Sequence, residues 1–266
     1  MKKLTSLADF SDDDGNVVES PTVFDKNIAI TIRGRNNRII VDPRARIKRL
    51  LVVFDCDNGT LIIGPNARHG FAMNIRIGQD ATVKIGADVT TTTMCIVSAV
   101  EGATVEFGDD VMIASENQFR ADDGHPIFDV DTGLRANPVK DIRIGSHVWF
   151  GAQAVALGGA DVGDGSVIGF RSVVTRTIPN NCIAVGTPAK VVRRHIAWER
   201  PHLSFVAPPY KPDISAIAKS EGYWRHTEEA GPVEETVPSE AAPVVRASKP
   251  GIVERVLGRF GYEKVR

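Results

Sequence analysis

The sequence predicts an all-β chain that winds into a left-handed parallel β-helix, and three observations support this fold class. Its 266 residues include 31 Val and 23 Ile but only 9 Leu, and β-branched side chains favour strands. Between residues 142 and 174, apolar residues recur at every sixth position. Gly and Asp, which tolerate turn conformations, lie between them. Six residues suit one flat side and a corner, so three sides make a coil of about 18 residues.

The clearest repeat fixes a register between successive coils. One apolar residue occupies each sixth position, in the order Ile144, Phe150, Ala156, Val162, Ile168 and Val174. Residues about 18 positions apart then stack in neighbouring coils, as parallel strands do. The register therefore predicts that Ile144 pairs with Val162, Phe150 with Ile168 and Ala156 with Val174.

The repeat changes in two other parts of the chain. Apolar runs between residues 20 and 60 keep no strict period, so we expect irregular early coils there. Residues 119–141 break the register altogether. We therefore predict a loop thrown out between two coils, and loops on rigid scaffolds are common places for chemistry.

The chain divides into a repeat domain over residues 1–200 and a C-terminal extension over residues 201–266. Residues 227–250 hold five Glu and four Pro with few large apolar groups, a composition typical of a linker. Beyond them, apolar residues at helical spacing predict a short amphipathic helix at about 251–262. This helix could dock on the repeat domain or a neighbouring subunit, or tether the chain to a partner or a membrane surface.

Composition excludes several classes of function. The net charge is −1, which gives no reason to expect nucleic-acid binding. No apolar run approaches the roughly 20 residues of a membrane-spanning helix, and the first residues lack the apolar region of a signal peptide. The three cysteines are scattered and predict neither a disulfide framework nor a metal site. We expect a cytoplasmic protein without a metal.

Three stretches carry a resemblance to a known family: Ile144–Gly151, Gly186-Thr187-Pro188-Ala189-Lys190 and the loop motif Gly124-His125-Pro126. Over roughly residues 60–200 the chain resembles the hexapeptide-repeat acyltransferases, especially the sugar and polysaccharide O-acetyltransferases of the maltose, galactoside and capsule-cluster type. The resemblance implies a homotrimer with its sites between adjacent β-helices, acetyl-CoA as donor, and a sugar or glycan as acceptor.

The resemblance also places the general base at His125. Transfer to a hydroxyl requires a group that takes a proton near neutral pH, and histidine is that side chain. We expect direct transfer without an acyl-enzyme. Neighbouring polar residues are candidates for orienting the imidazole or binding the acceptor, although each could be an ordinary loop residue: Asp122, Asp123, Arg120 and Asn117. The other histidines, His147 among them, show no partner pattern.

Further candidates concern the donor. The resemblance and the residue types suggest that acetyl-CoA is bound by Trp149, Gly151, Ala152, Phe170, Thr175, Lys190 and Arg193. Trp149 offers a flat apolar surface, and the two cationic groups could pair with phosphates. Trp149 could instead pack between subunits, and Lys190 and Arg193 could belong to a solvated basic face. Phe170 departs from the small residue usual in the family.

Two alternatives to an acetyltransferase remain open. A metal-dependent enzyme of the carbonic-anhydrase type also uses this scaffold, but it requires three histidine ligands, and the six histidines show no such pattern. A non-catalytic β-helix could serve as a binding or assembly module through its extension. The Gly-His-Pro motif favours the enzyme.

Overall fold

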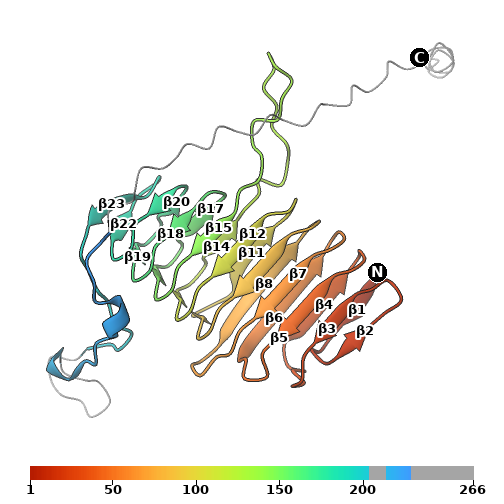
Figure 1. The fold of residues 1–266 in the computed structure, drawn as a ribbon, viewed down its shortest axis with the longest axis horizontal. Coiled ribbons are helices and arrows are strands. Elements are labelled where there is room, and N and C mark those ends of the chain that lie inside the picture. Colours follow the sequence, from red (N-terminus) through yellow and green to blue (C-terminus); the bar gives the residue numbers. More distant parts are fainter. Residues whose placement is uncertain (204–213, 229–266) are drawn as a thin grey trace, which may run out of the picture. The chain divides into compact units, whose positions relative to one another are not determined.

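The computed structural model describes residues 1–203 and 214–228, and in these residues almost all regular structure is β-strand (Figure 1). The strands form three sheets. The eight-stranded sheet contains, in spatial order, β1 (Lys2–Leu4), β4 (Ile28–Ile32), β6 (Ile47–Phe54), β8 (Phe71–Ile77), β11 (Cys95–Ala99), β14 (Gln118–Arg120), β17 (Val155–Leu157) and β20 (Val173–Val174).

The other two sheets run alongside it. The nine-stranded sheet contains β2 (Phe10–Ser11), β3 (Val17–Glu19), β5 (Arg38–Val41), β7 (Thr60–Ile63), β9 (Thr82–Ile85), β12 (Thr104–Phe107), β15 (Ile142–Ile144), β18 (Asp161–Val162) and β21 (Thr177–Ile178). The six-stranded sheet contains β10 (Thr90–Thr91), β13 (Met112–Ile113), β16 (Trp149–Phe150), β19 (Val167–Ile168), β22 (Ile183–Val185) and β23 (Lys190–Arg193). Two 3-10 turns, η1 (Ile214–Ala216) and η2 (Glu221–Tyr223), follow.

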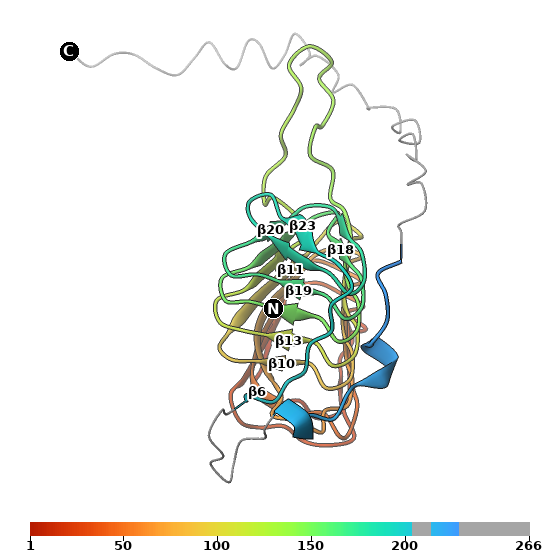
Figure 2. The ribbon, with the colours of Figure 1, turned by 90° about the vertical axis from the view of Figure 1, so that its left-hand side faces the viewer.

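The chain visits the three sheets in turn, and each circuit makes one coil. From β8 onward the order is eight-stranded, nine-stranded, six-stranded sheet, repeated up to β22. Figure 2 looks along the stack of coils. Strands of neighbouring coils pair in parallel, and only the pairs β1/β4, β2/β3 and β22/β23 are antiparallel among the named strands. These pairings confirm the predicted fold class.

The predicted register is also confirmed. Ile144 pairs with Val162, Phe150 with Ile168 and Ala156 with Val174. Their side chains point inward, where they are fully or almost fully buried. Hydrogen bonds between corresponding corner residues join positions 18 apart, as from the Ser146 amide to Asp164.

The early coils differ from our expectation, because they are regular. Leu61 pairs with Val83, and Val83 with Val105, while corner bonds such as that from Asn58 to Asp80 join residues 22 apart. Each wide coil has one extra inward residue on the side of the eight-stranded sheet and one on the side of the nine-stranded sheet, for example Ala99 and Ala103. Side chains alternate along a strand, so each extra inward residue adds two positions. A six-residue period cannot reveal a coil built in this way.

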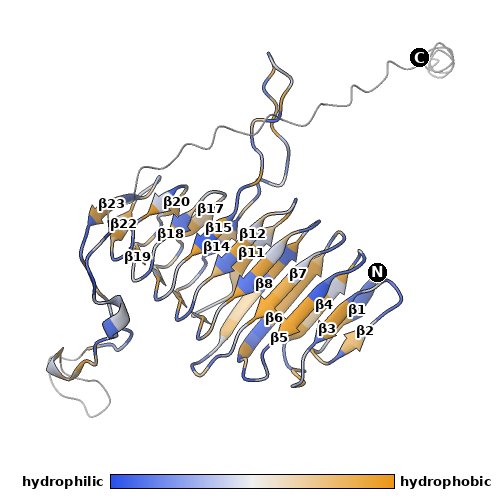
Figure 3. Cartoon of the chain, in the orientation of Figure 1, coloured by the Kyte–Doolittle hydropathy of each residue, from blue (hydrophilic) through white to orange (hydrophobic). Residues whose placement is uncertain are grey.

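The core is a continuous column of aliphatic and aromatic side chains inside the coils. Phe107, Phe119 and Phe150 pack edge to face in consecutive steps, with ring centroids 4.7 and 4.9 Å apart. Figure 3 shows hydrophobic residues concentrated in the strands and hydrophilic ones at the corners. This tightly packed column gives the residues of the corners and loops a rigid support.

Residues 194–203 and 214–228, here called the C-terminal segment, contact the coils. The Asn181 side chain, for example, donates hydrogen bonds to the carbonyl oxygens of Ile196 and Tyr223. The domain boundary at residue 200 stays a prediction. The helix expected at 251–262 and nearly all of the linker at 227–250 lie outside the described residues. In the part of the chain that is described, no helix is long and apolar enough to cross a membrane.

Candidate active site

His125 lies in the loop of residues 121–141, here called the His125 loop, which leaves the β-helix between β14 and β15. It departs where the eight-stranded sheet turns into the nine-stranded sheet, an edge that we call the loop corner. The loop projects as a long hairpin in Figures 1 and 2, and an antiparallel bridge joins Phe128 to Arg135 across it. The repeat was predicted to be interrupted at 119–141. The loop begins two residues later, because Phe119 and Arg120 still pair in the sheet.

Asn137 ties together the two arms at the base of this hairpin. Its amide nitrogen donates to the backbone oxygen of His125 and to the Asp123 carboxylate, each at 2.9 Å. Its amide oxygen accepts from the backbone nitrogen of Ile127 at 2.6 Å. Because two of these contacts hold the backbone at residues 125 and 127, Asn137 supports the part of the loop that carries the imidazole.

Asp122 anchors the first arm from below. Its buried carboxylate accepts from the Ser98 hydroxyl at 2.5 Å and from the backbone nitrogen of Gly124 at 3.0 Å. Arg76 lies between two carboxylates, with Nε 2.6 Å from Asp55 and a terminal nitrogen 3.7 Å from Asp122. The hydrogen bond to Asp55 raises the pKa of Arg76, against the effect of burial. Asp122 therefore supports the backbone beside His125.

A hollow of about 260 Å³ lies beside His125 at the loop corner, and its lining includes Arg76, Glu101, Asp122 and Arg135. Arg135 reaches back from the second arm to Glu101 at 2.5 Å. In the described residues, no hydrogen bond joins the His125 ring to Asp122 or Asp123, so the exposed imidazole is open to an incoming hydroxyl. The hollow therefore places several charged side chains beside the His125 imidazole.

Arg120 and Asn117, the other two acceptor candidates, do not line this hollow. The exposed Arg120 donates to Gln118 within β14. Asn117 is buried at a different corner, where its amide nitrogen donates to the backbone oxygens of Gly151 and Ala154. The structure thus brings Asp122 and Asp123 to His125 but not Asn117.

Most of the donor candidates gather on the six-stranded sheet. Trp149 lies in β16 with 38% of its surface exposed, and Phe170 follows β19 with 64% exposed. Lys190 and Arg193 are the ends of β23. Gly151 and Ala152 follow β16, and a Cβ on Gly151 would lie 2.9 Å from the Phe170 backbone nitrogen. The neighbouring coil therefore leaves no room for a side chain at position 151, whether or not acetyl-CoA binds there.

Thr175 is separated from these residues. It follows β20 and precedes β21, so it lies at the loop corner, as His125 does. In a three-sided coil, the edge between the eight- and nine-stranded sheets is opposite the six-stranded sheet. One chain therefore presents His125 and Trp149 on opposite sides, and a site that uses both needs two chains.

Sequence reasoning missed His147, which is almost fully buried at a corner next to the six-stranded sheet. Its ring stacks between Trp198 and Tyr223, with centroids 4.2 and 4.5 Å away. Nδ1 lies 2.7 Å from Asp110 and Nε2 lies 2.9 Å from the Trp198 carbonyl oxygen. His147 and its two aromatic partners are far apart in sequence, so no local spacing could indicate this cluster.

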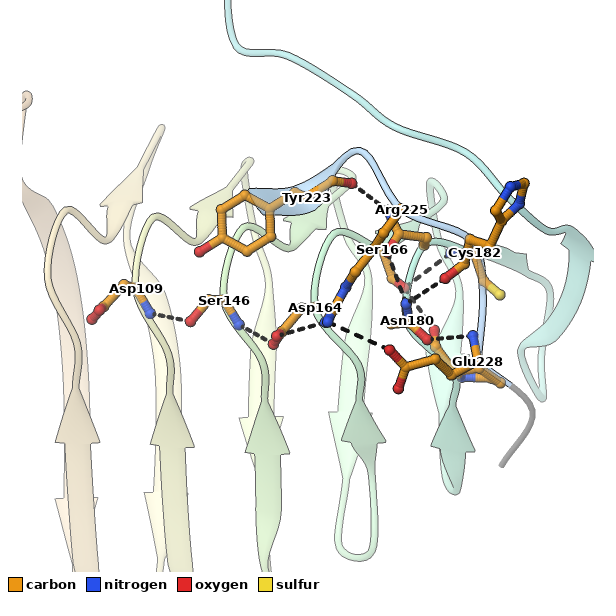
Figure 4. Close-up of polar contacts among 12 residues, drawn as sticks. Asp109, Ser146, Asp164, Ser166, Asn180, Cys182, Tyr223, Arg225 and Glu228 are labelled. Atoms are coloured by element: carbon orange, nitrogen blue, oxygen red, sulfur yellow. Dashed lines mark hydrogen bonds and ion pairs between the residues drawn. The ribbon is translucent and has the colours of Figure 1, made fainter. Parts of the chain in front are cut away.

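The end of the C-terminal segment continues along the same corners. Figure 4 shows Asp109, Ser146 and Asp164 in a row on successive coils, with Arg225 reaching Asp164 at 3.1 Å. Asn180 donates to the His226 carbonyl oxygen and accepts from the Glu228 amide. The segment thus binds the β-helix through specific polar contacts.

Comparisons with known proteins agree with this architecture. Residues 141–176 match the family model for the bacterial transferase hexapeptide (six repeats). The crystal structure of the polySia-specific acetyltransferase NeuO superposes with a TM-score of 0.62 at 36% sequence identity, covering 66% of this chain and 82% of that one. The chain belongs to the hexapeptide-repeat acyltransferases.

Two curated members of the hexapeptide-repeat acyltransferases have related sequences. The polysialic acid O-acetyltransferase of Escherichia coli O1:K1 / APEC is 41% identical over 96 residues, which are 36% of this chain and 31% of that protein. The galactoside O-acetyltransferase of Escherichia coli K12 is 40% identical over 100 residues, again 36% of this chain and 47% of that protein. The matched regions thus span less than half of either relative.

A second solved structure supports the fold of this family alone. The polysialic acid O-acetyltransferase OatWY has a TM-score of 0.57 at 22% identity and covers 72% of this chain. Among the residues that the structure describes, no group of three or more His, Cys, Asp or Glu side chains could hold a metal ion.

Proposed function

We propose that this protein is an acetyl-CoA-dependent O-acetyltransferase that modifies a hydroxyl group of a sugar or a cell-surface polysaccharide precursor. The observation that carries the proposal is the exposed His125, held by Asn137 and Asp122 on a loop of an acyltransferase scaffold. The similarity to a polysialic acid and a galactoside O-acetyltransferase supports a glycan acceptor. A cytoplasmic location, where acetyl-CoA is available, belongs to the same proposal.

The proposed reaction is a direct transfer. His125 removes the proton of the acceptor hydroxyl while its oxygen attacks the thioester carbonyl carbon. A C–O bond forms, and the tetrahedral oxyanion is stabilised by hydrogen-bond donors in the site. The C–S bond then breaks, and coenzyme A leaves as a thiol with the proton that His125 returns. No covalent intermediate on the protein is needed.

The proposed assembly is a homotrimer in which each site lies between two chains. One chain contributes the loop corner, with His125 and Thr175. Its neighbour contributes the face of the six-stranded sheet, with Trp149, Phe170, Lys190 and Arg193 along the donor. The positions of His125 and Trp149 on opposite sides of a single chain support this arrangement.

The test is thiol release from acetyl-CoA in the presence of a panel of sugars and oligosaccharides. Wild type should release thiol with at least one acceptor, and His125→Ala should reduce kcat by about 10²–10⁴-fold, the usual contribution of a general base. His226→Ala is the matched control, because its ring lies on the C-terminal segment, and it should retain wild-type turnover. Equal turnover by His125→Ala and wild type would refute the mechanism, and no turnover at all would favour a non-catalytic module.

A further inference from the structure

A second hollow lies on the six-stranded sheet, away from His125, and we call it the basic groove. Its volume is about 670 Å³ and its floor is formed by β10 and β13. Six side chains that are or can become positively charged line it: Arg46, Lys48, Arg68, His69, Arg200 and His202. Among the described residues, no Asp or Glu side chain lines it.

The nearest carboxylate does not neutralise this charge. Asp110 lies at the edge of the groove, where Oδ1 is 3.0 Å from Arg68 Nε and 2.7 Å from Arg200 Nε. Its Oδ2 lies 2.7 Å from His147. One negative charge therefore faces two arginines and a histidine. Within the described residues, Arg46 and Lys48 donate hydrogen bonds only to backbone oxygens, those of Arg68 and Thr91. Asp88, beyond the groove, also attracts Arg200, but the groove keeps a positive excess.

The C-terminal segment completes the groove. After Trp198 has stacked on His147, the chain runs along the coils, and Arg200 is anchored by hydrogen bonds to the Thr90 hydroxyl and the Asp110 backbone oxygen. Its guanidinium is mostly covered, with 15% of the side chain exposed. His202 follows on the same wall. An arginine held in this way has already lost its conformational freedom, so less entropy is lost when it binds a ligand.

The groove shares the face of Trp149. Met112, which lines the groove, pairs directly with Trp149 in the next coil. The donor candidates Phe170, Lys190 and Arg193 lie on the other side of Trp149, toward the end of the chain. Donor and groove would therefore occupy the two halves of one face, on either side of Trp149.

We infer that the basic groove binds the acceptor, and that the acceptor is a glycan carrying carboxylate groups. This inference rests on the proposed function. Arginine forms paired hydrogen bonds with carboxylates, and a row of cations over two coils suits a repeating acid better than a single charge. A neutral sugar would leave these cations unpaired.

Direct binding tests the inference without requiring turnover. The probes are an oligomer of sialic acid, which has one carboxylate per sugar, and a neutral galacto-oligosaccharide, titrated calorimetrically into the full-length protein at low salt. The wild type should bind the acidic oligomer more tightly, with affinity that falls as salt rises. Arg46→Gln/Lys48→Gln should raise Kd for the acidic oligomer about tenfold or more, because each charge-assisted bond lost contributes on that order.

The matched control is Lys3→Gln/Arg33→Gln, which removes the same two residue types from exposed positions outside the groove. It should leave Kd within about twofold, since isolated surface charges contribute little. Thr92→Glu supplies a second variant, because Thr92 is an exposed groove residue and the change adds a negative charge without removing a cation. Thr92→Glu should also raise Kd for the acidic oligomer. Thermal unfolding of each variant verifies that the fold is retained.

The inference is overturned if the wild type binds both oligomers equally or not at all, or if the groove and control variants behave alike. Turnover separates this result from the proposed function. Binding of the acidic oligomer without thiol release would support the inference about the groove and refute the proposed enzymatic function. Acetylation of neutral acceptors alone would support the proposed enzymatic function and refute the inference that the groove binds an acidic acceptor. With an acidic acceptor, the groove variants should raise KM and leave kcat unchanged, because His125 is intact.

Discussion

At the scale of single residues, the buried His147 and the partly buried Asp110 form a polar pair whose effect on stability depends on the charges around it. Both partners of the His147 ring, the Asp110 carboxylate and the Trp198 carbonyl, are acceptors. Burial acts to raise the pKa of Asp110, but the hydrogen bond from His147 and the charges of Arg200 and Arg68 outweigh it and lower that pKa.

This lowered pKa predicts a particular pH dependence of stability. A carboxyl group whose folded pKa lies below its usual value of 3.8 stabilises the fold fully above that value and progressively less as the pH falls toward the folded pKa. Asp110→Asn should therefore lower the free energy of unfolding at pH 7 by about 3 kcal/mol, as expected when one partner of a buried pair is removed. The gap to wild type should narrow below about pH 3.8.

Urea unfolding between pH 7 and pH 2.5 measures this gap. Asp131→Asn, at the exposed tip of the His125 loop, provides the control and should match wild type throughout. A gap between Asp110→Asn and wild type that stays constant, or widens, as the pH falls would contradict the assignment of the lowered pKa to Asp110.

At the scale of elements, the His125 loop shows what sequence patterns can and cannot anticipate. The break in the repeat predicted the loop to within two residues, because Phe119 and Arg120 still pair in β14. The role of Asn137 could not be foreseen, since it depends on the second arm returning beside the first. The regular early coils were missed for a related reason, because their strands are longer on two of the three sides.

The loop base leads to a prediction about positioning. Asn137→Ala removes the two contacts that hold the backbone at His125 and Ile127 and a third to the Asp123 carboxylate. We therefore expect kcat to fall about tenfold, comparable to other losses of alignment. KM and the thermal midpoint should change little, because the residue is partly exposed and outside the core. Asn137→Asp keeps an acceptor for the Ile127 amide but no donor for the His125 carbonyl, and should recover only part of kcat.

Steady-state kinetics and thermal unfolding of both variants test this role. Thr132→Ala is the control, because Thr132 bonds only within the loop tip, and it should leave kcat unchanged. If Asn137→Ala lowered the thermal midpoint substantially and left kcat intact, Asn137 would be structural and not a positioning residue.

At the scale of the whole molecule, the three-sided coil separates the groups that the proposed reaction needs. His125 departs from the loop corner, and Trp149 lies on the opposite six-stranded sheet. No flexing of a stacked core with buried phenylalanines could bring these two groups together within one chain. Association of copies around an axis would do so and would repeat the site.

Subunit complementation tests this arrangement. His125→Ala and Trp149→Ala should each have strongly reduced turnover alone. When the two variants are co-expressed and form mixed trimers, about a quarter of the sites should combine an intact His125 from one chain with an intact Trp149 from its neighbour. Turnover should then rise well above that of either variant. Mixed assemblies without any recovery, verified as trimers by light scattering, would contradict a shared site.

The sequence by itself determined the β-helix, the register of the later coils and the His125 loop, because these follow from local periodicity and its interruption. Only the tertiary structure decided that early coils are wider, that His147 joins Trp198 and Tyr223, and that Arg200 and His202 meet Arg46 and Lys48 in one groove. These groupings unite residues from several coils and from the C-terminal segment. The spacing of residues in the repeat cannot predict these groupings, because they depend on which corners the C-terminal segment contacts.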